Sequence, residues 1–449
     1  MSAASRTTRF SELSRRSQVF TATSRVLQVL AVMAKHGARC LRLIGGRLIG
    51  GGEGGPISSQ VLAEQLRDAL AELGPTFIKL GQVLSTRPDL VPPALETALS
   101  TLQDSAPTVP FEAVKLSVGA ELGADPDVVF CCFDRQPLAA ASIGQVHPAT
   151  LQDGRHVVVK VRRPGIGALI GLDLAILRRL ALLACAVPGP ARQLNLVGFV
   201  EEFGETTWAE LDYVGEGRNA DRARPKLAPL GVHVPEVVWA LTSSGVLTME
   251  RIYGAKIDDQ AALDAMGTDR AQLATTLAQA YLSMVFVDGF FHADPHPGNL
   301  FVEADGHLAM VDFGMMGTVA PRVRRALVEI LVALSTRDVK ASGRALRELG
   351  VVPAGVDEHE FSAELASLTS ATVDVPLGEL RLAPLLSQFL SVVRRHRLRV
   401  PRELALLMKT IVMCESLAAQ LDPAFSLASV IAPFVGAVFG TTKNVAGSD

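Results

Sequence analysis

The residues best suited to chemistry lie in two short stretches, His-Ala-Asp-Pro-His-Pro-Gly-Asn at 292–299 and Val-Asp-Phe-Gly at 311–314. Together they offer three oxygen-bearing side chains, Asp294, Asn299 and Asp312. Carboxylate and amide oxygens suit a hard cation such as Mg²⁺, which also keeps waters and takes phosphate oxygens from a substrate. A carboxylate that does not bind the metal can orient or deprotonate a hydroxyl group or a water. The two stretches therefore predict phosphate chemistry with magnesium.

The spacing of these residues matches the kinase pattern H-x-D-x-x-x-x-N followed by D-F-G. By this pattern Asp294 is the catalytic base or orienter of the attacking hydroxyl, and Asn299 and Asp312 hold Mg²⁺. A three-residue D-F-G string arises by chance, whereas two elements in the right order, separated by a predicted hairpin, are specific.

The first stretch has two other interpretations. In one, the histidines and carboxylates only cap turns. In the other, His292 and His296 bind zinc, since their i, i+4 spacing superficially fits an H-E-x-x-H site. Pro295 and Pro297 forbid the helix that such a zinc site needs, so this interpretation is discounted.

A phosphotransfer site also needs a cation for the nucleotide phosphates. Lys160 ends the run Val-Val-Val-Lys on the second strand of a predicted hairpin, where the kinase V-A-I-K lysine belongs. We expect Lys160 to bind the α- and β-phosphates of ATP; the alternative is an ordinary charge at a strand end. Glu210 and Glu216 are both candidates to hold this lysine, and the sequence does not decide between them.

The glycine-rich loop that usually covers the phosphates is absent, and Pro-Leu-Ala-Ala-Ala-Ser-Ile-Gly-Gln-Val stands at 137–146 instead. Alanines allow fewer positive-φ conformations and a less close backbone approach than glycines. Taken alone, this segment would be a plain small-residue turn. Within the constellation, Ala139, Ala140, Ala141 and Ser142 are expected to cover the nucleotide, and Glu250 is expected where a hinge contacts adenine.

The remaining sequence supplies the elements that must position these groups. Asp-Gly at 153–154 and at 305–306 each separates two strand-like runs, which is typical of hairpins. Further strands are expected at 232–239 and 245–249. Apolar periodicity predicts helices over 59–73, from 76 to about 87, and over 111–122, 172–186, 196–219 and 272–289, with mostly helical sequence beyond 321. Helices, then a strand-rich half, then a helical half predict a two-lobed α+β protein.

Charge and composition bound the function. The chain has 449 residues, enough for more than one domain, and a net charge of −3 gives no general attraction for nucleic acid. Residues 1–50 nevertheless carry nine Lys or Arg and a single acid, so they hold +8 and the remaining chain −11. The stretch 26–44 is either a basic amphipathic helix on an anionic membrane surface or a solvated extension. The five scattered cysteines favour a reduced cytosol.

The motifs together resemble the UbiB family, the aarF-domain-containing, ADCK-like atypical kinases linked to isoprenoid-quinone metabolism. The resemblance spans about residues 60–420 and rests on motifs that ordinary protein kinases lack. Its carriers are Phe-Ile-Lys-Leu-Gly-Gln at 77–82, Ser-Thr-Arg-Pro-Asp at 85–89, the alanine-rich loop, Glu-Leu-Asp-Tyr at 210–213 with Glu216 and Asn219, and the two stretches at 292–299 and 312–314.

The resemblance implies a protein-kinase-like fold with a helical N-terminal extension and a mostly helical C-lobe. The expected parts are a basic, Gly-rich extension (1–58), a helical extension with the Lys-x-Gly-Gln motif (59–125), an N-lobe (126–250), and a C-lobe with a short apolar tail at 429–441 (251–449). The motif would fold over the nucleotide site, bringing Lys79 and Gln82 towards Lys160 and one of the two glutamates.

The implied activity is Mg-ATP hydrolysis, or phosphoryl transfer to a small or lipid-associated acceptor such as a quinone precursor. No A-P-E follows the D-F-G, and the short activation segment agrees with a non-protein acceptor. The expected location is cytoplasmic, with peripheral contact at the inner face of the membrane. The rival functions are a nucleotide-gated binding module without catalysis and a membrane-surface scaffold for a lipid-modifying complex.

Overall fold

The computed structural model describes residues 23–42, 59–85, 91–102, 108–186, 195–336, 338–352, 363, 366, 381–395 and 400–431. The chain divides into two units. The first unit runs to Asp212 and includes Ser243–Val246, and the second consists of Tyr213–Thr242 and the chain from Leu247 onward. The predicted glycine-rich linker, most of the motif at 85–89, and most of the apolar tail lie outside the described residues.

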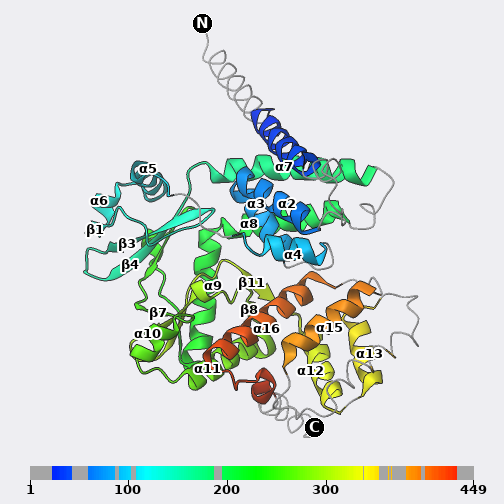
Figure 1. The fold of residues 1–449 in the computed structure, drawn as a ribbon. Helices are drawn as coiled ribbons and strands as arrows, with labels where there is room; N and C mark the ends of the chain where they lie inside the picture. The colour runs from blue at the N-terminus through cyan, green and yellow to red at the C-terminus, as the bar shows by residue number, and fades with distance from the viewer. Residues whose placement is uncertain are drawn as a thin grey trace, which may run out of the picture. The chain divides into compact units, whose positions relative to one another are not determined.

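The first unit is built on a group of helices (Figure 1). Their apolar faces meet in a buried cluster. Gly74, at φ 94°, separates the first two of them, since a left-handed residue ends a helix and the following Pro75 can start one. Phe77, Leu80 and Leu99 are among the buried side chains that join these helices. The helices of this unit are α2 (Ser59–Leu73), α3 (Pro75–Ser85), α4 (Pro93–Leu99), α5 (Phe111–Leu122), α6 (Pro126–Val129), α7 (Ile166–Ala186) and α8 (Leu196–Glu210).

A further helix covers residues 23–42 and is packed onto this group. Val29, Val32 and His36 are buried on one face, and Arg25 is buried in an ion pair with Asp173 of α7. These residues are therefore not a solvated extension. The opposite face of the helix exposes apolar side chains, namely Leu27, Leu30, Met33 and Leu41.

The strands of the first unit form the predicted hairpin and its neighbours. β3 (Gly144–Thr150) pairs antiparallel with β4 (His156–Arg162) around the Asp-Gly turn, as the sequence predicted. β1 (Cys132–Phe133) and β2 (Ala139–Ala140) both pair with β3. Val157, Val159 and Val161 alternate along β4 and are buried, as expected for a strand with one face against a core.

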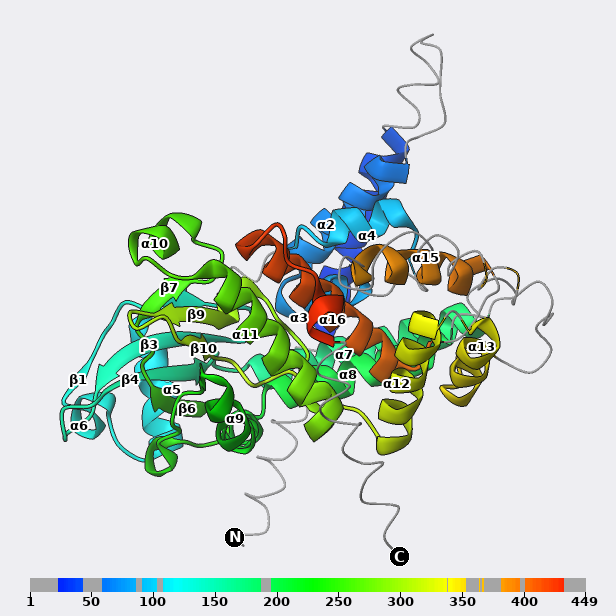
Figure 2. The same ribbon diagram turned by 90° about the horizontal axis from the view of Figure 1, so that it is seen from below.

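The second unit combines a four-stranded sheet, a two-stranded sheet and several helices, with β8 and β11 labelled in Figure 1 and β7, β9 and β10 in Figure 2. The larger sheet has the order β5-β10-β9-β7, and β8 pairs with β11. β6 (Val246–Glu250) begins in the first unit and ends in the second. The other strands are β5 (Val232–His233), β7 (Gly254–Lys256), β8 (Phe290–His292), β9 (Leu300–Glu303), β10 (Leu308–Met310) and β11 (Met316–Thr318).

The helices of the second unit pack in groups. One long helix, α16 (Arg402–Leu421), packs on both α11 (Arg270–Leu282) and α15 (Leu382–Arg395). α12 (Pro321–Thr336) packs on α13 (Val339–Glu348), and the two lie side by side in both ribbon views (Figures 1 and 2). α9 (Tyr213–Leu227) opens the unit, and α10 (Gln260–Ala265) precedes α11.

Three predicted elements differ in the structure. The helix expected over 196–219 is two helices, α8 and α9, because Leu211 turns into a buried cluster with Ile166 and Ile170. Of the strand expected over 232–239, only Val232–His233 forms β5; Pro235 has no N–H for a ladder bond, and beyond it Val237 makes an isolated bridge to Met249 of β6. The helix expected over 272–289 is α-helical to Leu282 and continues as a π-turn to Asp288.

Candidate functional site

Asn299 and Asp312 lie at the same end of one hairpin. β9 and β10 pair antiparallel, with Met310 opposite Leu300, and the Val311 N–H donates to the Asn299 carbonyl at 2.9 Å. Asn299 is the residue before β9, and Asp312 follows β10 by two positions. The hairpin register therefore brings together two residues that are 13 positions apart in the sequence.

His292 ties the first stretch to the second. It is 1% exposed, its Nε2 donates to the Asp312 carbonyl at 2.7 Å, and its Nδ1 accepts from the Asp294 N–H at 3.2 Å. Burial lowers the pKa of His292, and these two bonds suit the neutral ring with its proton on Nε2. The side chain positions the loop backbone, and its place at the end of β8 gives none of the helical geometry of a zinc site.

Asp312 has an unusual backbone conformation. Its φ is 60°, in the left-handed region, and its Oδ1 accepts from the Gly314 N–H at 3.2 Å. Aspartate tolerates this region because its short side chain bonds to the nearby backbone. A Cβ added to Gly314 would lie 3.2 Å from the Asp312 carboxylate and 3.6 Å from that of Glu216, so glycine leaves room for two acids beside the turn.

Helix α9 supplies the polar residues behind this turn. Glu216 is 3% exposed in its first turn, and Asn219, one helical turn later, donates from Nδ2 to the Phe313 carbonyl at 3.0 Å. Residues i and i+3 share one face of a helix, so α9 presents both to the Asp-Phe-Gly turn. Two residues of a separate sequence motif are thus part of this site.

Asp294 is the third residue of the group formed with Asn299 and Asp312, called the Asp294 group below. Its carbonyl accepts from Asn299 Nδ2 at 3.3 Å, and its carboxylate contacts Lys409 Nζ at 3.2 Å. Lys409 lies on α16 and was not among the site residues predicted from the sequence. The available signal was weak: Lys409 is the lone charge in an apolar run between Glu403 and Glu415.

Lys160 and the alanine-rich loop share one face of the sheet in the first unit. Lys160 on β4 stands opposite Val146 on β3, and Val146 stands opposite Ala139 on β2. Directly opposed residues of antiparallel strands project to the same face. The alanine-rich loop, which is expected to cover the nucleotide, contains the short strand β2, followed by Ser142, which is 3% exposed.

The Lys-x-Gly-Gln motif lies on α3, and its residues make an ion pair, a hydrogen bond and a close packing contact. Lys79 Nζ forms an ion pair with Glu210 of α8 at 2.6 Å. Gln82 Nε2 donates to the Leu102 carbonyl at 3.2 Å, just beyond α4, and a Cβ on Gly81 would overlap the Leu102 side chain. Of the two glutamates proposed to hold Lys160, Glu210 is thus bound by Lys79, and Glu216 lies in the second unit.

Glu250 ends β6 with its side chain bound to neighbours. Its Oε2 accepts from the Glu236 N–H at 3.2 Å and lies 3.2 Å from His233 Nε2, while His233 Nδ1 lies 2.8 Å from Glu303. Burial by itself lowers the pKa of His233, but the hydrogen bond to Glu303 and the charges of both glutamates outweigh it and raise the pKa. The Glu250 amide is also bonded, donating to the Glu236 carbonyl at 2.8 Å.

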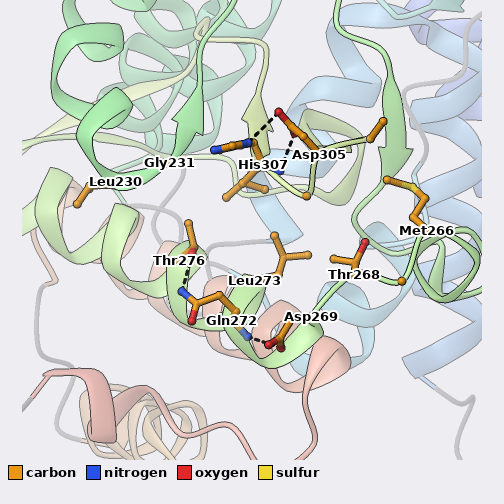
Figure 3. A pocket seen from close by; sticks show the side chains of 14 residues that line it. Leu230, Gly231, Met266, Thr268, Asp269, Gln272, Leu273, Thr276, Asp305 and His307 are labelled. Atoms are coloured by element: carbon orange, nitrogen blue, oxygen red, sulfur yellow. Dashed lines mark hydrogen bonds and ion pairs between the residues drawn. The ribbon is translucent and has the colours of Figure 1, made fainter.

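A cavity of about 490 Å³ lies at the turn end of the β9–β10 hairpin (Figure 3). Its wall contains the Asp305–His307 turn, and Asn299 and Asp312 stand at the opposite end of the hairpin. Its polar groups serve local structure: Asp269 caps α11 by accepting from the Gln272 N–H, and His307 pairs with Asp305. The cavity is thus separate from the Asp294 group.

The described residues contain no set of three His, Cys, Asp or Glu side chains arranged to hold a metal ion. Asn299 and Asp312 at the hairpin end, with Glu216 of α9 beside the turn, do suit Mg²⁺, which binds through one or two carboxylates plus waters and phosphate oxygens. The chemical nature of Asn299, Asp312 and Glu216 therefore fits a cation that arrives with a nucleotide.

Comparisons with known proteins agree on one family of kinase-like proteins. The ABC1 atypical kinase-like domain matches residues 101–345, and the UbiB helical domain matches residues 365–426. A probable protein kinase UbiB of Azotobacter vinelandii is 39% identical over 84% of this chain and 71% of its own length. A probable protein kinase UbiB of Xylella fastidiosa is 38% identical over 84% and 70%.

A solved structure is similar as well. The Mycobacterium tuberculosis protein Rv3197, determined in complex with erythromycin, is 28% identical and superimposes with a TM-score of 0.57. The match covers 80% of this chain and 92% of Rv3197. Together with the ABC1 match, it confirms the kinase-like α+β fold expected from the sequence.

Proposed function

Because the chain belongs to the UbiB family of atypical kinases, we propose that it binds ATP with Mg²⁺ and either hydrolyses ATP or transfers its terminal phosphoryl group. The observation that supports this most directly is the gathering of Asp294, Asn299 and Asp312 at one end of the β9–β10 hairpin, with His292 bonded to both stretches. These three groups are the metal ligands and the base that a kinase-type phosphoryl transfer uses.

Each residue has a proposed role. Asn299 and Asp312 would hold Mg²⁺, which when bound neutralises charge on the phosphates. Asp294 would orient the attacking hydroxyl or water and accept its proton. His292 keeps the loop backbone in position through its two bonds. Glu216, buried beside Asp312, would add negative charge for the cation.

The first unit would bind the remainder of the nucleotide. Lys160 would neutralise the α- and β-phosphates, and residues 139–142 would cover them, since Ala139 and Lys160 share one sheet face. The Lys79–Glu210 ion pair and the Gln82 bond to Leu102 would hold the family motif in a defined place within the first unit. Glu250 would mark the hinge at adenine.

A small or lipid-associated acceptor, such as a precursor of an isoprenoid quinone, is proposed from the family. The basic helix over 23–42 supports contact with a membrane surface, because Leu27, Leu30 and Met33 are exposed on it and Arg39 and Arg42 follow. We propose a cytoplasmic protein with peripheral contact at the inner face of the membrane.

One helical segment, Glu403–Leu421, is long and apolar enough by length and composition to cross a bilayer. Buried residues make up 44% of it, and core helices of soluble proteins meet the same criterion. The segment is part of α16, which packs on α11 and α15, and this packing is that of a core helix.

The decisive experiment compares phosphate release by the wild-type protein and by Asp294→Asn, with Mg-ATP binding measured on both. The proposal expects the variant to bind Mg-ATP while its turnover falls by about 100-fold or more, the scale of a lost general base. If the wild-type protein binds Mg-ATP but releases no phosphate above background, a nucleotide-gated binding module remains; equal release by both proteins would refute the role of Asp294.

The membrane contact has its own test. Leu27→Ser with Leu30→Ser should reduce co-sedimentation with vesicles of anionic lipid, whereas Leu116→Ser, which replaces an exposed leucine on α5, should not. Point variants are preferable to deleting the segment, since deletion would remove Arg25 and leave Asp173 buried without its partner. Unchanged vesicle binding by the double variant would refute the role of this helix.

A further inference from the structure

The carboxylate of Asp294 has a cationic partner that comes from another domain of the family. Lys409 Nζ lies 3.2 Å from Asp294 Oδ1. Asp294 lies within the residues matched by the ABC1 kinase-like domain, and Lys409 within those matched by the UbiB helical domain. Both belong to the second unit of the structure. We propose, on the basis of the proposed function, that Lys409 is a positioning residue for phosphoryl transfer, through which the helical domain completes the catalytic loop.

The loop itself supplies no such cation. Residues 292–299 contain two histidines but no lysine or arginine. The bonds within the loop fix its backbone: the Asp294 N–H donates to His292, and the Asp294 carbonyl accepts from Asn299. In the part of the chain that the structure describes, the Asp294 carboxylate is 36% exposed and pairs with Lys409, and this contact favours one direction of the side chain.

Helix α16 holds Lys409 in a fixed register. The neighbouring residue, Thr410, is 1% exposed, and its hydroxyl donates to the Leu406 carbonyl at 2.9 Å and lies 3.5 Å from the Ala293 carbonyl. Thr410 thus contacts the residue before Asp294 while Lys409 contacts Asp294 itself. A lysine within an apolar helix is costly unless it is paired or reaches water, and this one is paired at 23% exposure.

The charge of Lys409 also suits the reaction. Asp294, Asp312 and Glu216 are three acids in one unit, and a triphosphate brings further negative charge. An ammonium group beside the attacking position offsets that repulsion where the phosphoryl oxygens arrive.

The test uses the full chain and two variants of this residue. Lys409→Met keeps the length and apolar stem of the side chain and removes its charge, and Lys409→Arg keeps the charge. Lys340→Met, an exposed lysine on α13, is the matched control. We expect Lys409→Met to lower kcat for ATP turnover by about tenfold or more while the Kd for Mg-ATP changes by less than about threefold. Lys409→Arg should recover at least half of the wild-type kcat, and the control should match wild type.

A second measurement does not depend on turnover. Hydrogen exchange in the nucleotide-free protein should become faster in Lys409→Met over residues 290–300 and stay unchanged over β3 and β4. If the wild-type protein shows no Mg-dependent turnover, the proposed function fails, and exchange alone decides whether Lys409 orders the loop. A hydrogen-exchange rate over residues 290–300 that is the same in Lys409→Met as in wild type would overturn the inference. Turnover in Lys409→Met that equals or exceeds that of wild type would overturn the inference too. Faster turnover would mean that Lys409 slows the reaction.

Discussion

Arg25 and Asp173 form a two-pronged ion pair in the interior of the first unit, although 148 residues separate them. Arg25 Nε and Nη2 lie 2.7 and 2.9 Å from the two carboxylate oxygens, and Nη2 also donates to the Leu73 carbonyl at 2.8 Å. The Asp173 side chain is fully buried and that of Arg25 is 9% exposed. The pair therefore attaches the helix over 23–42 to α7 and to the end of α2.

Removing one partner of this pair should destabilise the first unit. Arg25→Met leaves a buried carboxylate without its cation, and we expect the free energy of unfolding to fall by about 3–5 kcal/mol. Chemical denaturation gives this value, and Arg25→Met with Asp173→Leu should regain much of the loss because no lone charge remains. A loss below about 1 kcal/mol in the single variant would contradict the buried pair.

Gly81→Ala should also destabilise the first unit. The added methyl group would overlap the end of the Leu102 side chain and approach Leu70 and Leu99, so these packed leucines must shift, at a cost of about 1–3 kcal/mol. Gly37→Ala is the control, because nothing lies within 4 Å of a Cβ there and alanine favours a helix. In thermal unfolding, the melting temperature should fall in Gly81→Ala and rise in Gly37→Ala, each relative to wild type. Equal melting temperatures would rule out the close approach.

Asp312→Asn should remove the magnesium dependence of nucleotide binding. Asparagine accepts the left-handed backbone at this position, so the change tests the charge of the ligand and leaves the turn in place. Calorimetry with Mg²⁺ should show ATP affinity reduced by about tenfold or more, while affinity in EDTA stays near wild type. Asp258→Asn, an exposed aspartate before α10, should change neither. Unchanged Mg-ATP affinity in Asp312→Asn would refute the metal assignment.

His233 should make the stability of the second unit depend on pH. Its pKa is raised above the usual 6.5, so the contribution of the charged ring is fully present below that value and is lost as pH rises through the higher folded-state pKa. The melting temperature of wild type should therefore exceed that of His233→Gln most near about pH 6, and this difference should shrink towards about pH 8.5. A difference independent of pH would contradict this.

The parts of the site that depend on neighbouring residues could be predicted from the sequence. The two Asp-Gly turns set their hairpins through local backbone chemistry, and the second of them brings Asn299 and Asp312 together. The kinase-like fold followed from motif order and is confirmed by the family matches. The roles of Asp294 and Lys160 remain predictions.

The parts that depend on distant packing could not be predicted. Lys409 lies 115 residues beyond Asp294, and nothing in its local sequence indicates that contact. Glu210 and Glu216 are six residues apart and look equivalent in the sequence. The structure places them on different helices, because α8 ends at Glu210 and α9 begins at Tyr213. The buried role of Arg25 was likewise hidden, because in the sequence it is one of nine basic residues near the N-terminus.

The position of Lys409 near the end of the described chain sets an order of events during synthesis. The ribosome releases the Asp294 loop more than 100 residues before the lysine that orients its carboxylate. A nascent chain can therefore fold its hairpin and acidic turn while the loop still lacks its ammonium partner. Premature termination before α16 would yield a polypeptide that keeps the signature motifs and the backbone bonds of the loop but lacks the cation beside Asp294.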